Sequence, residues 1–138
     1  MYRTLVAALA FAVVGSGVGL PRAAADNPVC TSTWCAFLLP SRNISCEMDY
    51  GRGGIPDETY CQTDSPPQTA RLSTDGSFKT CTGETCLGNP GQGTPTLAYG
   101  QTAAVGPFAC RSEPSGVTCT ITSRRGFTMS TAGVSAVG

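Results

Sequence analysis

The sequence predicts a small all-β domain, either an antiparallel β sandwich or an open barrel, stabilised by disulfide bonds. Three observations lead to this class. After residue 25 no window repeats apolar residues at helical spacing, short Thr- and aromatic-containing runs alternate with Gly and Pro, and the chain contains eight cysteines. A length of 138 residues favours one compact domain over two.

Composition excludes several functions. The chain contains no histidine, which removes the commonest general base and the commonest metal ligand. Lys plus Arg and Asp plus Glu number nine each, so there is no basic surplus of the kind that binds nucleic acid. We therefore expect no histidine-dependent chemistry, no nucleic-acid partner, no cofactor and no metal.

Residues 1–25 are expected to be an export signal. Arg3 provides the positive n-region, residues 5–19 are almost wholly apolar or glycine, and residues 23–25 form the small-x-small pattern that precedes cleavage. The apolar run is shorter than the roughly 20 residues that span a bilayer. We predict cleavage after Ala25, which leaves residues 26–138 as one secreted domain with no lipid anchor and no membrane span.

The best-defined hairpin covers residues 107–122. If residues 113–116 form its turn, Cys110 lies directly opposite Cys119, and such opposed positions are close enough for a disulfide. The period-two alternation of a strand then sends one set of side chains into the core. This set comprises Phe108, Cys110, Val117, Cys119 and Ile121. A slip of one residue would separate the cysteines and mix the two faces.

The other cysteines are assigned less tightly. A second hairpin pattern in residues 43–64 opposes Cys46 to Cys61, but its longer loop leaves the register less certain. The remaining pairs are predicted to be Cys30 with Cys35 and Cys81 with Cys86, and a crossed arrangement of these four stays open. Each of these pairs is separated by four residues rather than the usual two, which disfavours a four-thiolate zinc site.

Seven strands are expected, near residues 34–39, 43–48, 59–63, 96–99, 107–112, 117–122 and 127–131. Two stretches rich in turn residues, 65–77 and 88–95, are expected to be loops. The last residues, 132–138, are expected to be a loosely held tail.

Two kinds of side chain could form a functional site. Two pairs of carboxylates, Glu47 with Asp49 and Asp57 with Glu58, could supply the acid and base of a glycoside hydrolase. Glu47 and Asp49 flank one residue of a strand, so we expect both on its wet face, where a solvated charge is commoner than a catalytic one. Aromatic residues could instead form a carbohydrate- or peptide-binding platform, although packing is their commoner role. They are Trp34, Tyr50, Tyr60 and Tyr99.

Four sequence islands occur within residues 37–131. They are PSxNIxC at residues 40–46, LxYGQ at 97–101, GxFxC followed by GVTC at 106–119, and GFTxS at 126–130. In this order they resemble a family of small secreted actinobacterial, chiefly mycobacterial, proteins of unknown function. In those relatives a histidine usually precedes the Gly-Phe pair, where this chain has Arg125, and Cys86 is an additional cysteine. The resemblance implies compartment and fold and leaves biochemistry open.

These observations favour a non-enzymatic extracellular module that binds a cell-envelope or other extracellular partner as a monomer. The prediction rests on exclusion, because histidine is absent, the thiols are expected to be bridged, and no carboxylate pair is shown to converge. Two alternatives stay open: a carboxylate-dependent glycan hydrolase, and a structural or antigen-like secreted protein without a specific ligand.

Overall fold

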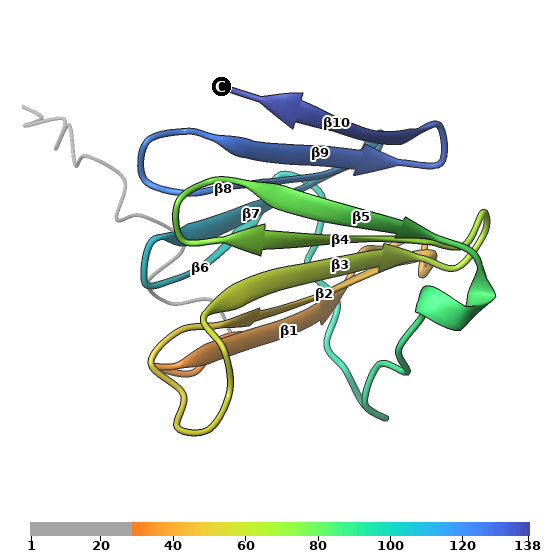
Figure 1. Cartoon of the computed structure of the whole chain (residues 1–138). Helices are drawn as coiled ribbons and strands as arrows, with labels where there is room; N and C mark the ends of the chain where they lie inside the picture. The colour runs from red at the N-terminus through yellow and green to blue at the C-terminus, as the bar shows by residue number, and fades with distance from the viewer. Residues whose placement is uncertain (1–28) are drawn as a thin grey trace, which may run out of the picture.

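Ten strands form two five-stranded antiparallel sheets that pack face to face (Figure 1). The computed structural model describes residues 29–138. The first sheet contains β1 (Trp34–Leu38), β2 (Ile44–Asp49), β3 (Glu58–Thr63), β4 (Gln68–Ser73) and β5 (Phe78–Thr82). The second contains β6 (Thr102–Val105), β7 (Phe108–Glu113), β8 (Gly116–Thr120), β9 (Gly126–Ser130) and β10 (Gly133–Val137). The all-β prediction is confirmed, and of its two alternatives the structure is the sandwich.

Each sheet is a meander in which every strand pairs with its neighbours in the chain. A short 3-10 helix, η2 (Glu84–Cys86), begins the connection from the first sheet to the second. Strands β1 and β2 lie against β6, and β3 and β4 lie against β9. Two residues connect β7 to β8, and this tight turn produces the predicted register, with Cys110 opposite Cys119.

The core lies between the sheets and follows the period-two alternation of the strands. Each inward-facing apolar side chain of the central strands is buried, whereas its chain neighbours point to the outer faces. The buried apolar strand residues are Cys35, Phe37, Ile44, Cys46, Met48, Cys61, Ala70, Leu72, Ala103, Val105, Phe108, Cys110, Val117, Cys119, Phe127 and Met129. Ile121 is partly buried and packs against this set.

Two cross-strand disulfides meet at the centre of the core. Cys46–Cys61 joins β2 to β3, and Cys110–Cys119 joins β7 to β8. Both link directly opposed residues whose Cα atoms are 4.1 Å apart, as in the close pairs of an antiparallel ladder. The Sγ atoms of Cys61 and Cys119 lie 3.5 Å apart, so the two bridges touch across the sheets.

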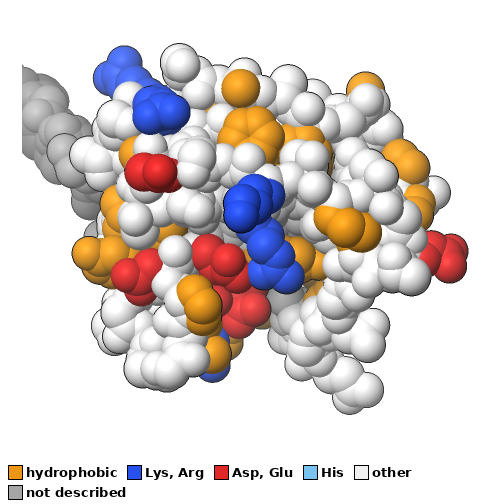
Figure 2. Space-filling view, in the orientation of Figure 1, with side chains coloured by type: hydrophobic (Ala, Val, Ile, Leu, Met, Phe, Trp, Pro, Cys, Tyr) orange, Lys and Arg blue, Asp and Glu red, His pale blue; other side chains and the backbone are white. Residues whose placement is uncertain are grey.

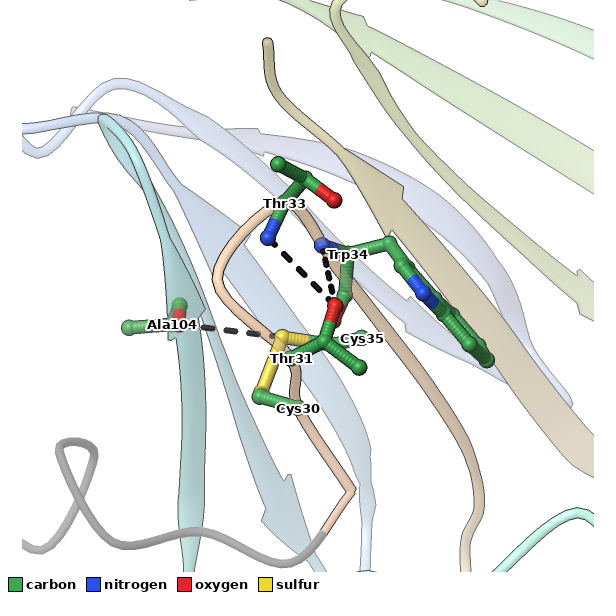
Figure 3. The surroundings of a disulfide bond; sticks show 6 residues. All are labelled: Cys30, Thr31, Thr33, Trp34, Cys35 and Ala104. Atoms are coloured by element: carbon green, nitrogen blue, oxygen red, sulfur yellow. Dashed lines mark hydrogen bonds between the residues drawn. A yellow bond between two sulfur atoms is a disulfide. The ribbon is translucent and has the colours of Figure 1, made fainter. Parts of the chain in front are cut away.

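The other two disulfides lie at the periphery. Cys30–Cys35 closes a small turn at the start of β1, where Cys35 Sγ lies 3.6 Å from the carbonyl oxygen of Ala104 on β6 (Figure 3). Cys81–Cys86 connects β5 to η2. The pairing is therefore sequential and not crossed. All eight cysteines of the chain lie within the described residues and are bridged, so the three clustered sulfurs of Cys46, Cys61 and Cys119 offer no thiolate to a metal.

Several segment predictions are wrong. Residues 96–99 do not form a strand, since only Thr96 makes an isolated bridge, to Leu38. The predicted loop at 65–77 contains β4, and the predicted tail at 132–138 contains β10. Strands β5 and β6 were not predicted either. These segments are polar or built from small residues, and they become strands because neighbouring strands supply hydrogen-bond partners.

The predicted signal peptide and its cleavage site lie outside the described residues. Within residues 29–138, no helix has the length and apolar character needed to cross a bilayer.

The close approach of β8 and β9 requires a glycine at position 126. A Cβ atom built there would collide with the carbonyl oxygen of Cys119, and backbone cannot move aside as a flexible side chain can. We expect Gly126→Ala to lower the free energy of unfolding by about 3 kcal/mol or more. Gly53→Ala is the matched control, because a Cβ there meets nothing within 4 Å. Urea unfolding of the oxidised proteins that gave equal losses would contradict this packing.

The central bridges should contribute more to stability than the peripheral ones. Replacing Cys110 and Cys119 together by Ala removes a cross-link and leaves a cavity beside the second bridge, so we expect a loss of about 4 kcal/mol. The same change at Cys81 and Cys86 removes a cross-link of the surface, and we expect about 2 kcal/mol. Thermal unfolding of both double variants measures the difference, and equal losses would argue against a stacked core.

Candidate functional site

The outer face of the first sheet carries a groove of about 890 Å³. Because side chains alternate along each strand, the residues that do not enter the core point to this outer face, and many of them are polar or aromatic. Figure 2 shows acidic and basic groups side by side on the surface. The groove is lined on its sheet side by Trp34, Ala36, Ser45, Glu47, Asp49, Glu58, Tyr60, Gln62 and Arg71. Arg52, the core residues Phe37 and Cys46, and residues 86–95 and 29–31 complete the lining.

Small side chains create the floor of the groove. Ala36 on β1 and Ser45 on β2 point outward, Ala36 opposite Glu47 and Ser45 opposite Gln62, and the larger Trp34 and Tyr60 lie nearby on the same face. In Figure 1 the β2–β3 connection and the segment after η2 project beyond the sheet on the two sides of β1. These short side chains, together with the larger ones nearby and the two projecting loops, leave an open hollow.

One wall of the groove is fastened to the sheet through Gln62. The Gly88 N–H donates to Gln62 Oε1 at 2.9 Å and lies 3.2 Å from the Tyr60 hydroxyl oxygen. The Tyr60 hydroxyl itself donates to Gln62 Oε1 at 2.6 Å, and Gln62 Nε2 donates to Asp64 at 2.9 Å. Gln62 is only 2% exposed although it faces outward. The loop at 88–95 is thus attached at its first residue.

The far end of the same loop is attached to β1. The Leu38 N–H donates to the carbonyl oxygen of Pro95 at 2.8 Å, and the Leu97 N–H donates back to Leu38 at 2.8 Å. Residues 88–95 therefore form a wall that is held at both ends, which agrees with their predicted loop conformation.

Trp34 is positioned by the turn that the Cys30–Cys35 disulfide closes. The Thr31 N–H donates to the carbonyl oxygen of Trp34 at 2.7 Å, and the Thr31 hydroxyl oxygen accepts from the Trp34 N–H at 3.2 Å. Figure 3 shows the indole on the opposite side of β1 from Ala104. The ring is therefore directed away from the core and toward the outer face.

Arg52 joins the two carboxylates that the sequence singled out on β2. Its Nη1 lies 3.0 Å from Asp49 Oδ1 and 3.3 Å from Glu47 Oε1, and its guanidinium lies 5.1 Å from the Trp34 ring centroid. The hydrogen bond to Asp49 raises the pKa of Arg52 above its usual value. Glu47 is exposed as expected, but Asp49 is only 5% exposed, which corrects the prediction that both are solvated.

A second arginine repeats this arrangement farther along the sheet. Arg71 Nη1 lies 2.7 Å from Glu58 Oε1, and the guanidinium lies 4.6 Å from the ring centroid of Tyr60, the residue directly opposite on β3. Both groove aromatics thus contact an arginine that is itself paired with a carboxylate.

The structure separates the other candidates from this site. Tyr50 packs edge-on against Phe108, with ring centroids 6.5 Å apart, and Tyr99 is 43% exposed and does not line the groove. Asp57 accepts a hydrogen bond from the Gly51 N–H at 2.8 Å, which stabilises the β2–β3 connection, while its neighbour Glu58 lines the groove. Of the four aromatic candidates, Trp34 and Tyr60 both line the groove. Of the two carboxylate pairs, Glu47 and Asp49 converge.

Sequence reasoning missed Arg52, Gln62 and Arg71. Arg71 was hidden because residues 65–77 resemble a loop, although the outward position opposite Tyr60 follows once β4 is recognised. Arg52 lies in a turn, where no periodicity predicts which side chain it contacts. Comparison with protein-family models, curated proteins and solved structures found no match to this chain.

Removal of the acceptor on Gln62 should free the loop. In Gln62→Leu the Gly88 N–H and the Tyr60 hydroxyl both lose the same acceptor, Gln62 Oε1, at a cost of about 1 kcal/mol for each bond. We expect amide exchange at Gly88 and the following residues to become about 3- to 10-fold faster. Gln92→Ala on the exposed part of the same loop is the control. Unchanged protection in Gln62→Leu would show that this bond does not hold the loop.

Proposed function

We propose that this protein is a secreted, non-enzymatic binding module, and that the groove on the outer face of its first sheet holds an extracellular or cell-envelope ligand. The observation that carries the proposal is the groove itself, a hollow of about 890 Å³ with aromatic and hydrogen-bonding side chains on a rigid sheet. Four disulfides are compatible with an oxidising extracellular compartment.

Convergence of Glu47 and Asp49 favours one alternative, a carboxylate-dependent glycan hydrolase. Both oxygens contact the same nitrogen of Arg52, so the carboxylates are near enough to flank a glycosidic bond. A hydrolase, however, needs both carboxyl groups free to contact the substrate, and here both are held in ion pairs with the same guanidinium. The ion pairs therefore support binding over hydrolysis.

A cosedimentation experiment separates these functions. Purified, oxidised residues 26–138 are mixed with insoluble peptidoglycan, arabinogalactan and host-matrix polymers, and both the pelleted protein and the released reducing sugar are measured. Specific pelleting without sugar release is the expected result. Sugar release that is lost in the Glu47→Gln, Asp49→Asn double variant would establish the hydrolase. The control variant is Glu113→Gln, because Glu113 lies on the second sheet, paired with Arg111. If the protein neither pellets nor releases sugar, the structural or antigen-like role is the remaining alternative.

Secretion has its own test. We expect the mature protein recovered from culture medium to begin at Asp26, because residues 23–25 form the cleavage motif after the apolar run. Intact-mass measurement of secreted protein checks this. Retention of residues 1–25 on protein from the medium would contradict the export signal.

A further inference from the structure

Every charged side chain of the groove lies in an ion pair within the groove, although three carboxylates facing two arginines leave a single negative surplus. Its three sheet carboxylates all lie in ion pairs, Glu47 and Asp49 with Arg52, and Glu58 with Arg71. A strongly ionic ligand would have to break one of these ion pairs, or place its charge beside side chains that are already paired. The negative surplus disfavours an anionic ligand, and an uncharged ligand leaves all the ion pairs intact, so the electrostatics favour a ligand without net charge.

The ion pairs nevertheless leave hydrogen-bonding capacity toward the open side. Each arginine contacts its carboxylates through Nη1, and Glu47 and Glu58 each use only Oε1 in these pairs. A guanidinium has five N–H donors and a carboxylate has two acceptor oxygens, so each pair presents an adjacent donor and acceptor. A pair of neighbouring hydroxyls, each both donor and acceptor, matches this pattern.

The remaining lining of the groove is uncharged. The loop at 88–95 carries no Asp, Glu, Lys or Arg, and its polar side chains are Asn89, Gln92 and Thr94. Ala36 on the floor and Trp34 beside it add apolar surface that suits the C–H face of a sugar ring. Amides, aromatic surface and paired charges together fit a ligand with many hydroxyls and apolar ring faces.

The size of the hollow bears on ligand length. Ligand sites for small molecules usually enclose about 300 to 1,000 Å³, and this groove lies in the upper part of that range. It is also open, bounded by residues 86–95 and 29–31 beside the outer face of the sheet. A segment of a polymer fits such a shape better than a single enclosed monosaccharide.

We propose that the ligand is a neutral oligosaccharide segment, packed against the exposed part of Trp34 that Arg52 leaves uncovered and hydrogen-bonded by the Arg52 and Arg71 ion pairs. This inference rests on the proposed binding function and names its ligand class.

Calorimetric titration of the oxidised chain tests the proposal with defined probes. They are neutral glucan, mannan, galactan and arabinan fragments, anionic polygalacturonate fragments, cationic chitosan fragments and a neutral proline-rich peptide. We expect binding to at least one neutral glycan, with an affinity that changes less than about twofold between about 50 and 500 mM NaCl. Trp34→Ala should weaken it about tenfold or more, because it removes the stacking surface.

Two further variants keep the test valid should Trp34→Ala unfold the chain. Asn89→Ala with Gln92→Ala alters only the exposed loop and should weaken neutral-glycan binding, whereas Tyr99→Ala, outside the groove, should not. Groove-dependent binding of the peptide or of a charged polymer instead would overturn the glycan inference and keep the binding function. The absence of any groove-dependent binding would overturn both.

Discussion

The contact between two disulfides at the centre of the sandwich organises the rest of the structure. Cys61 of the first sheet and Cys119 of the second bring their sulfurs to 3.5 Å, and each sulfur belongs to a bridge between adjacent strands. Each bridge locks the register of its hairpin, because a slip of one residue would separate the cysteines. The contact between them then fixes how one sheet lies over the other, with Phe37, Phe108 and Phe127 buried around it.

This central layer explains how the outer face can carry a site. A sheet whose register is covalently fixed does not depend on its outward residues for alignment, so those positions can hold small or paired polar groups. Ala36 and Ser45 leave the hollow, while Trp34 and Tyr60 stand beside it. A peripheral bridge supports each side of the groove, since Cys30–Cys35 closes the turn under Trp34 and Cys81–Cys86 precedes the loop that Gln62 holds.

The parts that the sequence predicts are those governed by local pairing. The β7–β8 register follows from a tight turn and two cysteines that only one alignment can oppose. Strands β4 and β10 also pair with their neighbours in the chain, but their own residues are largely polar or small and carry little β preference. The burial of Asp49 follows from Arg52, a turn residue that folds back over it, and the role of Arg71 depends on β4. Side-chain contacts of this kind leave no periodic signal.

The most direct test of the account is the position of the sulfur atoms. Anomalous diffraction from the native sulfurs of the oxidised protein locates all eight cysteine sulfurs without any assumption about the fold. We predict four disulfide-bonded pairs of sulfurs, with the Cys46–Cys61 and Cys110–Cys119 bridges in van der Waals contact at about 3.5 Å. Bridges between other cysteines, or two central bridges separated by intervening side chains, would contradict it.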